Sequence, residues 1–406
     1  MPESTTAGRR GKDVRSDCWV EFEPKRRGGL DIKVVSKVES MFGASIRALC
    51  GEILEALGVR HCGLKLEDAG ALPWAIAARI ECAVRRTPEY GSQASTMTTF
   101  LPDLKPCCTH GTTRDRLRRS RLYLPGNEPK FMINAGLHRP DGIILDLEDA
   151  VAPAEKDAAR LLVRNALRQV DFYGAERMVR INQGKAGLED LEWIAPHHVH
   201  VILIPKCESA EQVKAVDAKI AAILRPKSKI QNPKSAIFLM PIIESALGGI
   251  KAYEIATASP NIIALAIGLE DYTADIGVQR TLEGRESFWL RSVVVNAARA
   301  AGIQPIDTVF SDVADMEGLR ESALEAKALG FDGKGCIHPR QIAVVHKAFA
   351  PDPKEVERAR KIVAAFEEAQ KQGLGVVALG SKMIDPPVVK RALRTMKLAE
   401  AMGKIV

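Results

Sequence analysis

The sequence has few aromatic residues and no long apolar run. Phe, Trp and Tyr together make up 5% of its 406 residues. A membrane-spanning helix needs about 20 consecutive apolar residues, and no run approaches that length, so we expect no membrane partner. Residues 1–13 are polar and basic without an apolar core segment, so we expect no secretory signal either.

Paired cysteine motifs are also missing. None of the eight cysteines has C-x-x-C spacing, and the adjacent Cys107 and Cys108 suit neither a zinc site nor a disulfide scaffold. This use of cysteine is typical of a reducing compartment, so we expect a cytoplasmic protein.

Part of the formal charge of +7 comes from two basic clusters, at residues 9–15 and 114–121. A basic cluster can bind nucleic acid, but these clusters have no interleaved aromatic residues, so we expect no nucleic-acid partner. A ligand that carries phosphate groups, such as a coenzyme A derivative, would need some of this positive charge. A solvated tail or linker would carry it equally well, and the clusters alone do not separate these cases.

Eight short apolar runs lie between Arg121 and Pro339, and each ends in a polar or charged cluster. The runs span residues 121–126, 142–149, 177–182, 199–206, 236–244, 262–271, 304–312 and 333–338. The stretches between them are long enough for one helix each, as parallel crossovers require. The pattern predicts an α/β fold, a (β/α)8 TIM barrel.

Polar residues gather at the C-terminal ends of these runs. They are Glu148, Asp149, Arg180, Lys206, Glu244, Asp271, Asp312 and His338. In such barrels the C-terminal strand ends and the loops after them form the active face. The middles of the runs are Ile, Leu and Val, so this uneven distribution indicates a catalytic face.

A separate α+β pattern precedes the barrel, over residues 14–87. Alternation of period two and helical spacing with Gly58 as the closing residue indicate its elements. We expect strands at residues 18–22, 30–34 and 64–66 and helices at residues 38–57 and 72–84. The first two strands would be joined by a turn rich in Lys, Arg and Gly.

Periodicity disappears over residues 88–119, where Gly, Ser, Thr and Pro dominate, and we interpret this segment as a flexible linker. A coil of this length spans roughly 30 Å, enough for the small domain to reach the barrel mouth. The barrel is expected over residues 120–350 and a C-terminal helical arm over residues 351–406. In the arm, two prolines after Asp385 are expected to hold a short segment outside a helix.

Glu244 and Asp271 end the fifth and sixth predicted strands, which are neighbours in a barrel. Two carboxylates with waters and substrate oxygens are the usual ligands of Mg²⁺. Each carboxylate could instead cap the helix that follows, because acidic residues favour helix N-termini. The pair, taken with the other strand ends, favours the metal site.

Arg180 ends an otherwise apolar strand and needs an anionic partner, which is either a structural carboxylate such as Glu148 or a substrate carboxylate. Lys206 ends the fourth predicted strand and could pair with the same cluster, or act only in structure. Residues 197–200, HHVH, suggest metal ligands. They lie at a strand start, opposite the expected active face, so we interpret these histidines as surface residues.

The motifs from Arg118 to the C-terminus resemble those of the citrate lyase β subunit. They are RLYLPGN (121–127), ILDLEDAV (144–151), VRIN (179–182), PIIES (241–245), GLEDY (268–272), FDGKGCIHPRQI (331–342), GLGVV (373–377) and SKMID (381–385). The broader group, the HpcH/HpaI aldolase/citrate lyase family, includes malyl-CoA and citramalyl-CoA lyases with the same barrel. So many motifs in one order make the resemblance specific.

The resemblance implies a Claisen-type cleavage, in which a citryl thioester gives oxaloacetate and an acetyl thioester. Mg²⁺ on Glu244 and Asp271 would hold the hydroxyl oxygen and a carboxylate of the oxaloacetate half. Arg180 would stabilise the same developing charge. Asp385 would enter the site from a neighbouring subunit and exchange a proton with the thioester enolate.

The resemblance also implies a substrate-binding set and partners. The residues that match positions in contact with the coenzyme-like arm of the thioester are Tyr123, Lys130, Ile337 and His338. Arg180 and Glu244 complete the substrate-binding set, with Glu148, Asp149 and Lys206 in support. An arm that donates Asp385 predicts a homo-oligomer, a trimer or hexamer, and a citrate lyase α subunit would be a further partner.

The N-terminal unit resembles the citrate lyase γ subunit, the acyl carrier protein, in VESMFGASIR (38–47) and EDAGALPWAIAARIE (67–81). In that family a serine just before a Gly or Ser and then Asp carries a phosphoribosyl-dephospho-CoA prosthetic group. Here Arg15 aligns with the attachment position, and Ser16 is displaced by one. Either Ser16 carries the group, or the group has been lost and the barrel uses free CoA thioesters.

Three functions fit these residues. The leading one is an Mg²⁺-dependent lyase that cleaves citryl-CoA or a citryl-carrier thioester. A malyl-CoA or citramalyl-CoA lyase or synthase would use the same metal site, Arg180 and Asp385, because only the pocket around the acyl half separates these substrates. A non-catalytic scaffold of a lyase complex would be supported by loss of Glu244, Asp271 or Asp385, and all three are present.

Overall fold

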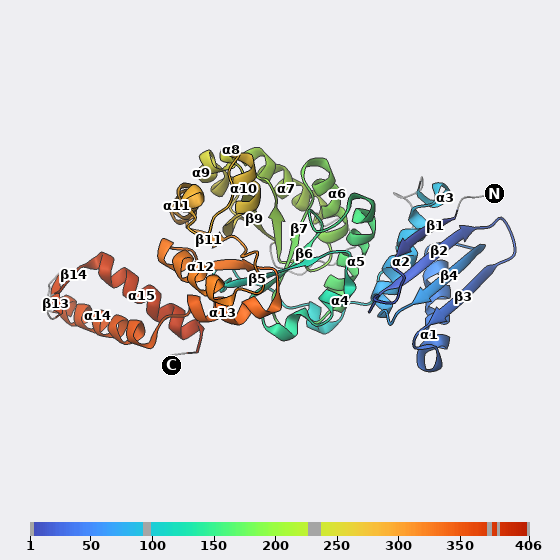
Figure 1. The fold of residues 1–406 in the computed structure, drawn as a ribbon, viewed down its shortest axis with the longest axis horizontal. Coiled ribbons are helices and arrows are strands. Elements are labelled where there is room, and N and C mark those ends of the chain that lie inside the picture. Colours follow the sequence, from blue (N-terminus) through green and yellow to red (C-terminus); the bar gives the residue numbers. More distant parts are fainter. Residues whose placement is uncertain (1–3, 92–98, 226–236, 372–375, 380–381, 404–406) are drawn as a thin grey trace.

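The computed structural model describes residues 4–91, 99–225, 237–371, 376–379 and 382–403. Figure 1 shows three bodies along the long axis: a small unit of sheet and helices at the N-terminal end, a barrel surrounded by helices in the centre and a helical arm at the C-terminal end. This arrangement confirms the predicted fold class.

Eight parallel strands form the closed barrel, in chain order and with β12 beside β5. They are β5 (Ser120–Pro125), β6 (Gly142–Asp146), β7 (Glu176–Arg180), β8 (Val201–Ile204), β9 (Phe238–Ile243), β10 (Ala264–Ile267), β11 (Gln304–Asp307) and β12 (Gly333–Cys336). Each strand overlaps one predicted run. Asp271 differs most from expectation: it lies in α10 (Leu269–Asp275), because β10 stops at Ile267 and Gly268 begins that helix.

Helices cover the outside of the barrel. Those after β6, β7 and β8 are α5 (Lys156–Gln169), α6 (Gly184–Ile194) and α7 (Ala210–Ile223). Those after β9 to β12 are α8 (Ala246–Ile250), α9 (Ala252–Ala256), α10, α11 (Arg285–Ala300), α12 (Met316–Leu329) and α13 (Pro339–Phe349). Short helical turns are α3 (Pro88–Gly91), η1 (Pro106–Cys108), α4 (Pro129–Met132), η2 (Ala135–His138) and η3 (Pro153–Glu155).

Side chains on the barrel strands alternate between the interior and the helical layer, as the two-residue period of a strand requires. Ile144 and Met178 belong to an interior cluster with Met240 and Ile242. Leu145, next to Ile144, packs in the main core outside the strands. The same alternation decides which residues beyond this apolar layer face the barrel axis.

The N-terminal unit is a four-stranded sheet with two helices. Its elements are β1 (Thr5–Gly8), β2 (Cys18–Pro24), β3 (Leu30–Ser36), α1 (Glu39–Ala56), β4 (Cys62–Asp68) and α2 (Pro73–Arg85). The strand order is β1-β2-β4-β3, so β4 lies between the first two predicted strands, antiparallel to β2 and parallel to β3. The three predicted strands and two predicted helices are confirmed.

Strand β1 was not predicted. Its residues are mostly small and polar, and of its four residues only Ala7 is buried, so no apolar alternation marks it. It pairs with β2 along its whole length. The sheet therefore begins at Thr5, before the predicted start of the unit at residue 14.

Helix α2 joins the N-terminal unit to the barrel. It packs against β2 and α1 on one side and against α5 on the other, so every residue from Trp74 to Val84 is buried. Arg164 donates to Glu81 at 2.7 Å, and neither side chain is more than 1% exposed. The Asn165 amide donates to the Trp74 carbonyl at 3.0 Å. These contacts fix the unit on the barrel.

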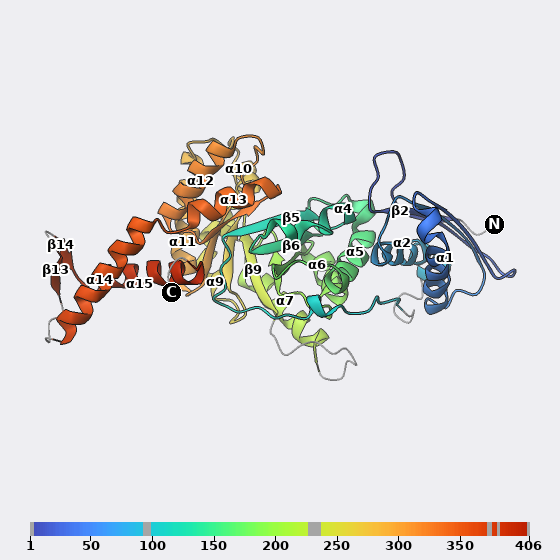
Figure 2. The same cartoon turned by 90° about the horizontal axis from the view of Figure 1, so that it is seen from below.

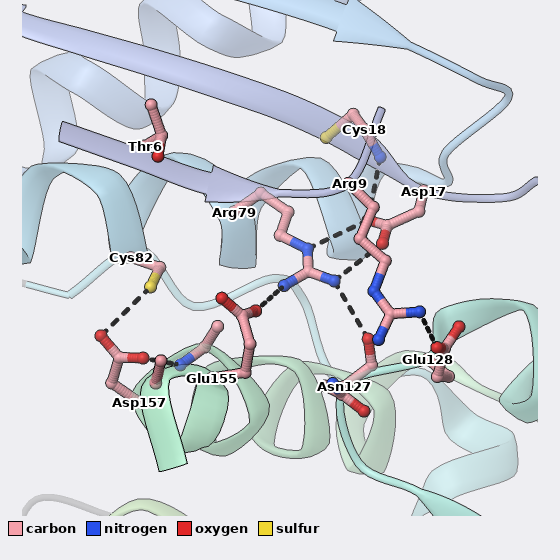
Figure 3. A network of polar contacts seen from close by, with 12 residues as sticks. Thr6, Arg9, Asp17, Cys18, Arg79, Cys82, Asn127, Glu128, Glu155 and Asp157 are labelled. Atoms are coloured by element: carbon pink, nitrogen blue, oxygen red, sulfur yellow. Dashed lines mark hydrogen bonds and ion pairs between the residues drawn. The ribbon is translucent and has the colours of Figure 1, made fainter. Parts of the chain in front are cut away.

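A second network lies at the loop between β1 and β2 (Figure 3). Arg79 donates twice to Asp17, at 3.0 and 2.7 Å, and also to the Asn127 carbonyl at 3.0 Å. Arg9 forms an ion pair with Glu128 close by. Asn127 and Glu128 follow β5 at its C-terminal end, so this loop sits beside the rim of the expected active face.

The stretch from residue 99 to 119, part of the predicted flexible linker, packs along the barrel. The Lys105 N–H donates to the Arg168 carbonyl at 3.0 Å. Arg118 donates twice to Glu176, at 2.7 and 2.8 Å, and both side chains are fully buried. The linker prediction is wrong for this stretch, because its contacts are made by individual backbone groups and arginines that composition does not reveal.

His110 of the same stretch packs against His200 of the HHVH sequence, with 5.3 Å between the ring centroids. Arg177 donates to the His110 carbonyl at 2.9 Å and to the His198 carbonyl at 2.8 Å. His197, His198 and His200 are at most 7% exposed, so the prediction that they are surface residues is wrong. Burial lowers the pKa of His197 and His200 to about 3, which keeps both neutral.

The arm consists of α14 (Pro353–Lys371), the hairpin β13 (Val377–Leu379) and β14 (Lys382–Ile384), and α15 (Pro386–Ala401). The predicted non-helical segment is confirmed for residues 382–385, but Pro386 and Pro387 begin α15, so the prediction is wrong for the two prolines. Proline is tolerated there because a first-turn N–H has no helical partner. Asp385 caps α15 by accepting the Val388 N–H at 3.1 Å. Gly380 and Ser381 lie outside the described residues.

Within the described residues, no helix is both long enough and apolar enough to cross a membrane. All eight cysteines are free thiols, and seven of them are buried.

We predict that Glu81→Ala destabilises the protein strongly. The change leaves the buried guanidinium of Arg164 without its carboxylate, which should lower the free energy of unfolding by about 3 to 5 kcal/mol. Urea unfolding followed by circular dichroism measures it. Glu52→Ala, which removes an exposed carboxylate on α1, is the matched control and should shift the midpoint little. Equal shifts for the two variants would show that the buried pair does not stabilise the interface.

Candidate active site

The inward positions at the C-terminal end of the barrel carry charged residues. Asp146 on β6, Arg180 on β7 and Glu244 after β9 each stand two residues beyond a member of the apolar interior layer. These three residues line a cavity of about 230 Å³. Other lining residues are Arg121, Tyr123, Asp271, Thr308 and Ile337. Strand alternation therefore directs one guanidinium group and two carboxyl groups to a single cavity.

Arg180 is held by two acids. Its Nε and Nη2 donate to Asp146 at 2.7 and 2.6 Å, and its Nη1 lies 2.9 Å from a Glu148 oxygen. Burial opposes the charge, but the bonds and negative charges of Asp146 and Glu148 raise the pKa of Arg180 above its usual value. The ring of Tyr123 lies under the guanidinium, with its centroid 5.5 Å away. Arg180 therefore presents a fixed positive charge at the cavity wall.

Lys206 connects the acids of neighbouring strand ends. Its Nζ lies 3.5 Å from Glu148, 3.6 Å from Asp149 and 3.4 Å from Asp271. Partial burial opposes the charge, but these three carboxylates raise its pKa. The backbone at Lys206 is left-handed, with φ of 45°, and its N–H donates to Glu244 at 2.6 Å. This turn aims both the N–H and the ammonium group at carboxylates.

Glu244 is a buried carboxylate with little compensation. It is 4% exposed, and burial raises its pKa to about 8, with the negative charge of Asp271 adding to the effect. A Cβ at Gly268 would lie 2.3 Å from Glu244 Oε2, so any larger residue there would displace the carboxylate. Gly268 thus leaves room for the Glu244 carboxylate, and the Lys206 N–H donates to it from the other strand end.

The cavity suits a divalent cation held by a pair of carboxylates. Among the residues that the structure describes, no group of three or more His, Cys, Asp or Glu side chains converges as a metal site. Glu244 and Asp271 both line the cavity and interact electrostatically. A hard cation would offset the buried charge of Glu244, and its remaining ligands would be waters or substrate oxygens. The donor set therefore fits Mg²⁺.

Residues 119–339 match the HpcH/HpaI aldolase/citrate lyase family. This chain belongs to that family. Residues 7–87 match the family of the malonate decarboxylase delta subunit, MdcD, an acyl-carrier type of domain. The lyase barrel and the carrier-like unit are thus fused in one chain.

Relatives named as lyases or lyase subunits align with about 70% of this chain. The chain is 42% identical to the citrate lyase subunit beta of Leuconostoc mesenteroides subsp. cremoris, over 71% of this chain and 95% of that one. It is 35% identical to the human mitochondrial citramalyl-CoA lyase, over 70% and 86%. This family member is therefore a carbon–carbon lyase of the citrate lyase β type.

Solved structures agree with the barrel assignment. The protein CitE from Mycobacterium tuberculosis, crystallised with magnesium, acetoacetate and coenzyme A, is 32% identical, with a TM-score of 0.59. The match covers 71% of this chain and all of that one. A second CitE structure, with magnesium and pyruvate, has a TM-score of 0.52 at 32% identity.

The lyase barrel brings most of the sequence-predicted residues together. Arg180, Glu148, Asp149, Lys206, Glu244 and Asp271 form one connected cluster, and Tyr123 and Ile337 line the cavity. His338 and Asp312 instead bond to nearby backbone: His338 caps α13, and Asp312 accepts the N–H groups of Ala314 and Asp315. Neither lines this cavity.

Three predicted residues lie apart from the cavity. Lys130 is on α4, 3.3 Å from Glu128. Asp385 lies between β14 and α15. Figures 1 and 2 both show β14 at the tip of the arm, far from β9 and α10, so this chain does not bring its own Asp385 to its own cavity. Ser16 is half-buried in the loop before β2, with a left-handed backbone (φ of 55°) and its N–H bonded to the Ala69 carbonyl at 3.0 Å.

Sequence reasoning missed Asp146, Arg121 and Gly268 as parts of the site. The signal for Asp146 was present, because it stands two residues after Ile144 on the inward side of β6. Arg121 stands two residues before Tyr123, also on the inward side. For Gly268 the decisive fact is its close approach to Glu244, which only coordinates reveal.

Proposed function

We propose that this chain cleaves citryl-CoA to oxaloacetate and acetyl-CoA in an Mg²⁺-dependent reaction. The observation that carries the proposal is one cavity in which the carboxylate pair Glu244 and Asp271 faces the fixed charge of Arg180. Two findings support it. The chain is 42% identical to a citrate lyase β subunit, and the CitE relative was crystallised with coenzyme A and magnesium.

In this reaction the bond between the carbinol carbon and the thioester methylene breaks. Its electron pair goes to the thioester as an enolate, while the hydroxyl loses its proton and becomes the ketone of oxaloacetate. Mg²⁺ on Glu244 and Asp271 would act as a Lewis acid toward the hydroxyl oxygen and the adjacent carboxylate. Arg180, already fixed by Asp146, stabilises the negative charge that develops on that oxygen without needing to reorganise.

The enolate must then gain a proton to become the acetyl thioester. We assign this to Asp385 of a neighbouring subunit, because Asp385 lies at the end of a projecting arm and not at its own cavity. The arm therefore predicts a closed homo-oligomer, a trimer or hexamer, in which each site is completed by the next chain.

The substrate is proposed to be a free CoA thioester. The resemblance to the carrier family aligns Arg15, and not a serine, with the attachment position, and the half-buried Ser16 sits in a loop fixed by the Arg79–Asp17 pair. The packing of α2 against α5 favours a unit that stays in place over one that carries a bound acyl group between sites. The alternative hypothesis is a citryl-carrier thioester, which would require a prosthetic group on Ser16 and a citrate lyase α subunit as partner.

The second candidate is a citramalyl-CoA or malyl-CoA lyase or synthase. The human relative is a citramalyl-CoA lyase, and the metal pair and Arg180 would serve that substrate equally well. A non-catalytic scaffold is disfavoured, because Glu244, Asp271 and Arg180 converge on one cavity.

We expect the purified chain with Mg²⁺ to release oxaloacetate from citryl-CoA with a higher kcat/KM than it cleaves citramalyl-CoA or malyl-CoA. Coupled assays for oxaloacetate, pyruvate and glyoxylate measure the three reactions. Intact mass of the same preparation should equal that of the unmodified chain. Preference for citramalyl-CoA or malyl-CoA would support the second candidate, and added mass on Ser16 would support the carrier.

Mg²⁺ binding should strengthen with pH up to about pH 8 and then level off. Below that pH, Glu244 holds a proton that the cation must displace, so each unit of lower pH costs up to about tenfold in affinity. Isothermal titration of Mg²⁺ between pH 6 and 9 measures this. Glu244→Gln should abolish the binding, while Glu254→Gln, an exposed carboxylate on α9, should behave as wild type. A pH-independent affinity would contradict the assignment of Glu244.

Mixing inactive chains tests the shared site. Asp385→Ala and Glu244→Ala chains, allowed to exchange subunits, should regain roughly a quarter of wild-type activity, because random pairing gives half of the cavities an intact Glu244 and half of those an intact Asp385 neighbour. A mixture of Glu244→Ala and Asp271→Ala is the control. It should stay inactive, because Glu244 and Asp271 belong to the cavity of the same chain, so every cavity in the mixture lacks one of them. No recovery in the first mixture would place Asp385 outside the reaction.

A further inference from the structure

Arg121 is a buried guanidinium on the wall of the active-site cavity. It stands on the inward side of β5, two residues before Tyr123, and only 1% of it is exposed. It is one of the largest fully buried side chains in the described chain. A charged group of this size is rarely buried without a partner.

Arg121 has no such partner among the described residues. None of the described carboxylate oxygens lies within 4 Å of it. Its Nη1 contacts the Met240 sulfur at 3.1 Å, its Nη2 reaches the Asp307 carbonyl only at 3.4 Å, and its Nε has no hydrogen bond to a described residue. The nearby Asp307 carboxylate is bound to Lys334 at 2.8 Å and to Arg291 at 3.2 Å. Burial lowers the pKa of Arg121 below its usual value.

Other buried arginines of the barrel are satisfied. Arg118 has Glu176, Arg164 has Glu81, and Arg177 donates to the carbonyls of His198 and His110. These guanidinium groups have either a carboxylate or carbonyl acceptors within 2.9 Å, whereas Arg121 at the cavity has neither. A buried cation with open donors costs stability, and an anionic ligand would recover that cost.

We infer that Arg121 binds a second carboxylate on the oxo-acid half of the substrate and thereby selects a dicarboxylic product over a monocarboxylic one. This inference rests on the proposed function and names the specificity determinant of the same cavity. The first carboxylate, next to the hydroxyl, belongs with Glu244, Asp271 and Arg180, and Arg121 is a separate positive charge beside them.

The chemistry of the three candidate substrates makes this selection possible. A citryl thioester yields oxaloacetate, whose second carboxylate can accept two bonds from the guanidinium fork. Citramalyl and malyl thioesters carry a methyl group or a hydrogen at that place, so they would leave Arg121 unpaired in a dry cavity. A site with a buried polar group strongly rejects the analogue that cannot satisfy it.

Arg121→Met tests the inference, because methionine keeps apolar volume and removes the charge. We expect kcat/KM for citryl-CoA to fall about 100-fold, with kcat/KM for citramalyl-CoA unchanged or raised. Arg121→Lys, which keeps a positive charge, should restore part of the citryl-CoA activity. The midpoint of urea unfolding of Arg121→Met should equal or exceed that of wild type, since an unpaired buried charge is removed.

A matched control separates specificity from structure. Arg177→Met removes a buried guanidinium on β7 that does not line the cavity, and it should destabilise the protein without changing the ratio of the two kcat/KM values. If Arg121→Met lowers stability and reduces both substrates in equal proportion, then Arg121 is structural and the inference is overturned.

Binding of the products distinguishes this inference from the proposed function. In the presence of Mg²⁺, wild type should bind oxaloacetate more tightly than pyruvate by isothermal titration, and Arg121→Met should remove the difference. If no thioester is cleaved but this binding pattern holds, the proposed function fails and the role of Arg121 stands. If citryl-CoA is cleaved and Arg121→Met binds both products as wild type does, only the role of Arg121 fails.

Discussion

The active face depends on the ion pair between Arg180 and Asp146. The two residues are partners in the register of β7 and β6, so their side chains meet on the inward side where the strands end. With two nitrogens fixed by Asp146, the third reaches Glu148, and Glu148 in turn lies within 3.5 Å of Lys206. The backbone of Lys206 then holds Glu244. Electrostatic pairing thus runs from one strand end to the next, and each group is placed by its neighbour.

Much of the barrel could be predicted from the sequence because its signals are local. Apolar runs of strand length with helix-length spacers allow few arrangements other than parallel crossovers. The ends of the strands were predicted less accurately: Asp271 was assigned to a strand although it lies in α10. An apolar run does not show where strand pairing stops, because Ile267 and Leu269 are buried alike in strand and helix.

Features that depend on contacts distant in the sequence could not be predicted in this way. The stretch from residue 99 to 119 has the composition of a linker, yet Arg118 meets Glu176 in the barrel. His110 of that segment also packs against the buried His200 of the HHVH sequence. In the site, the acids and bases at the strand ends were found, whereas the importance of Arg121 comes from what it fails to contact. Composition and spacing carry no information about a missing partner.

Helix α2 has a consequence for the history of the chain. Its residues from Trp74 to Val84 are buried from two sides, by the carrier-like sheet and by α5 of the barrel, so one helix serves both cores. Two separate polypeptides would each expose half of that shared core, including Arg164 or Glu81 stripped of its partner. Separation would now require many compensating surface changes at once. The carrier-like unit therefore serves as a structural wall of the barrel, whether or not it performs any carrier chemistry.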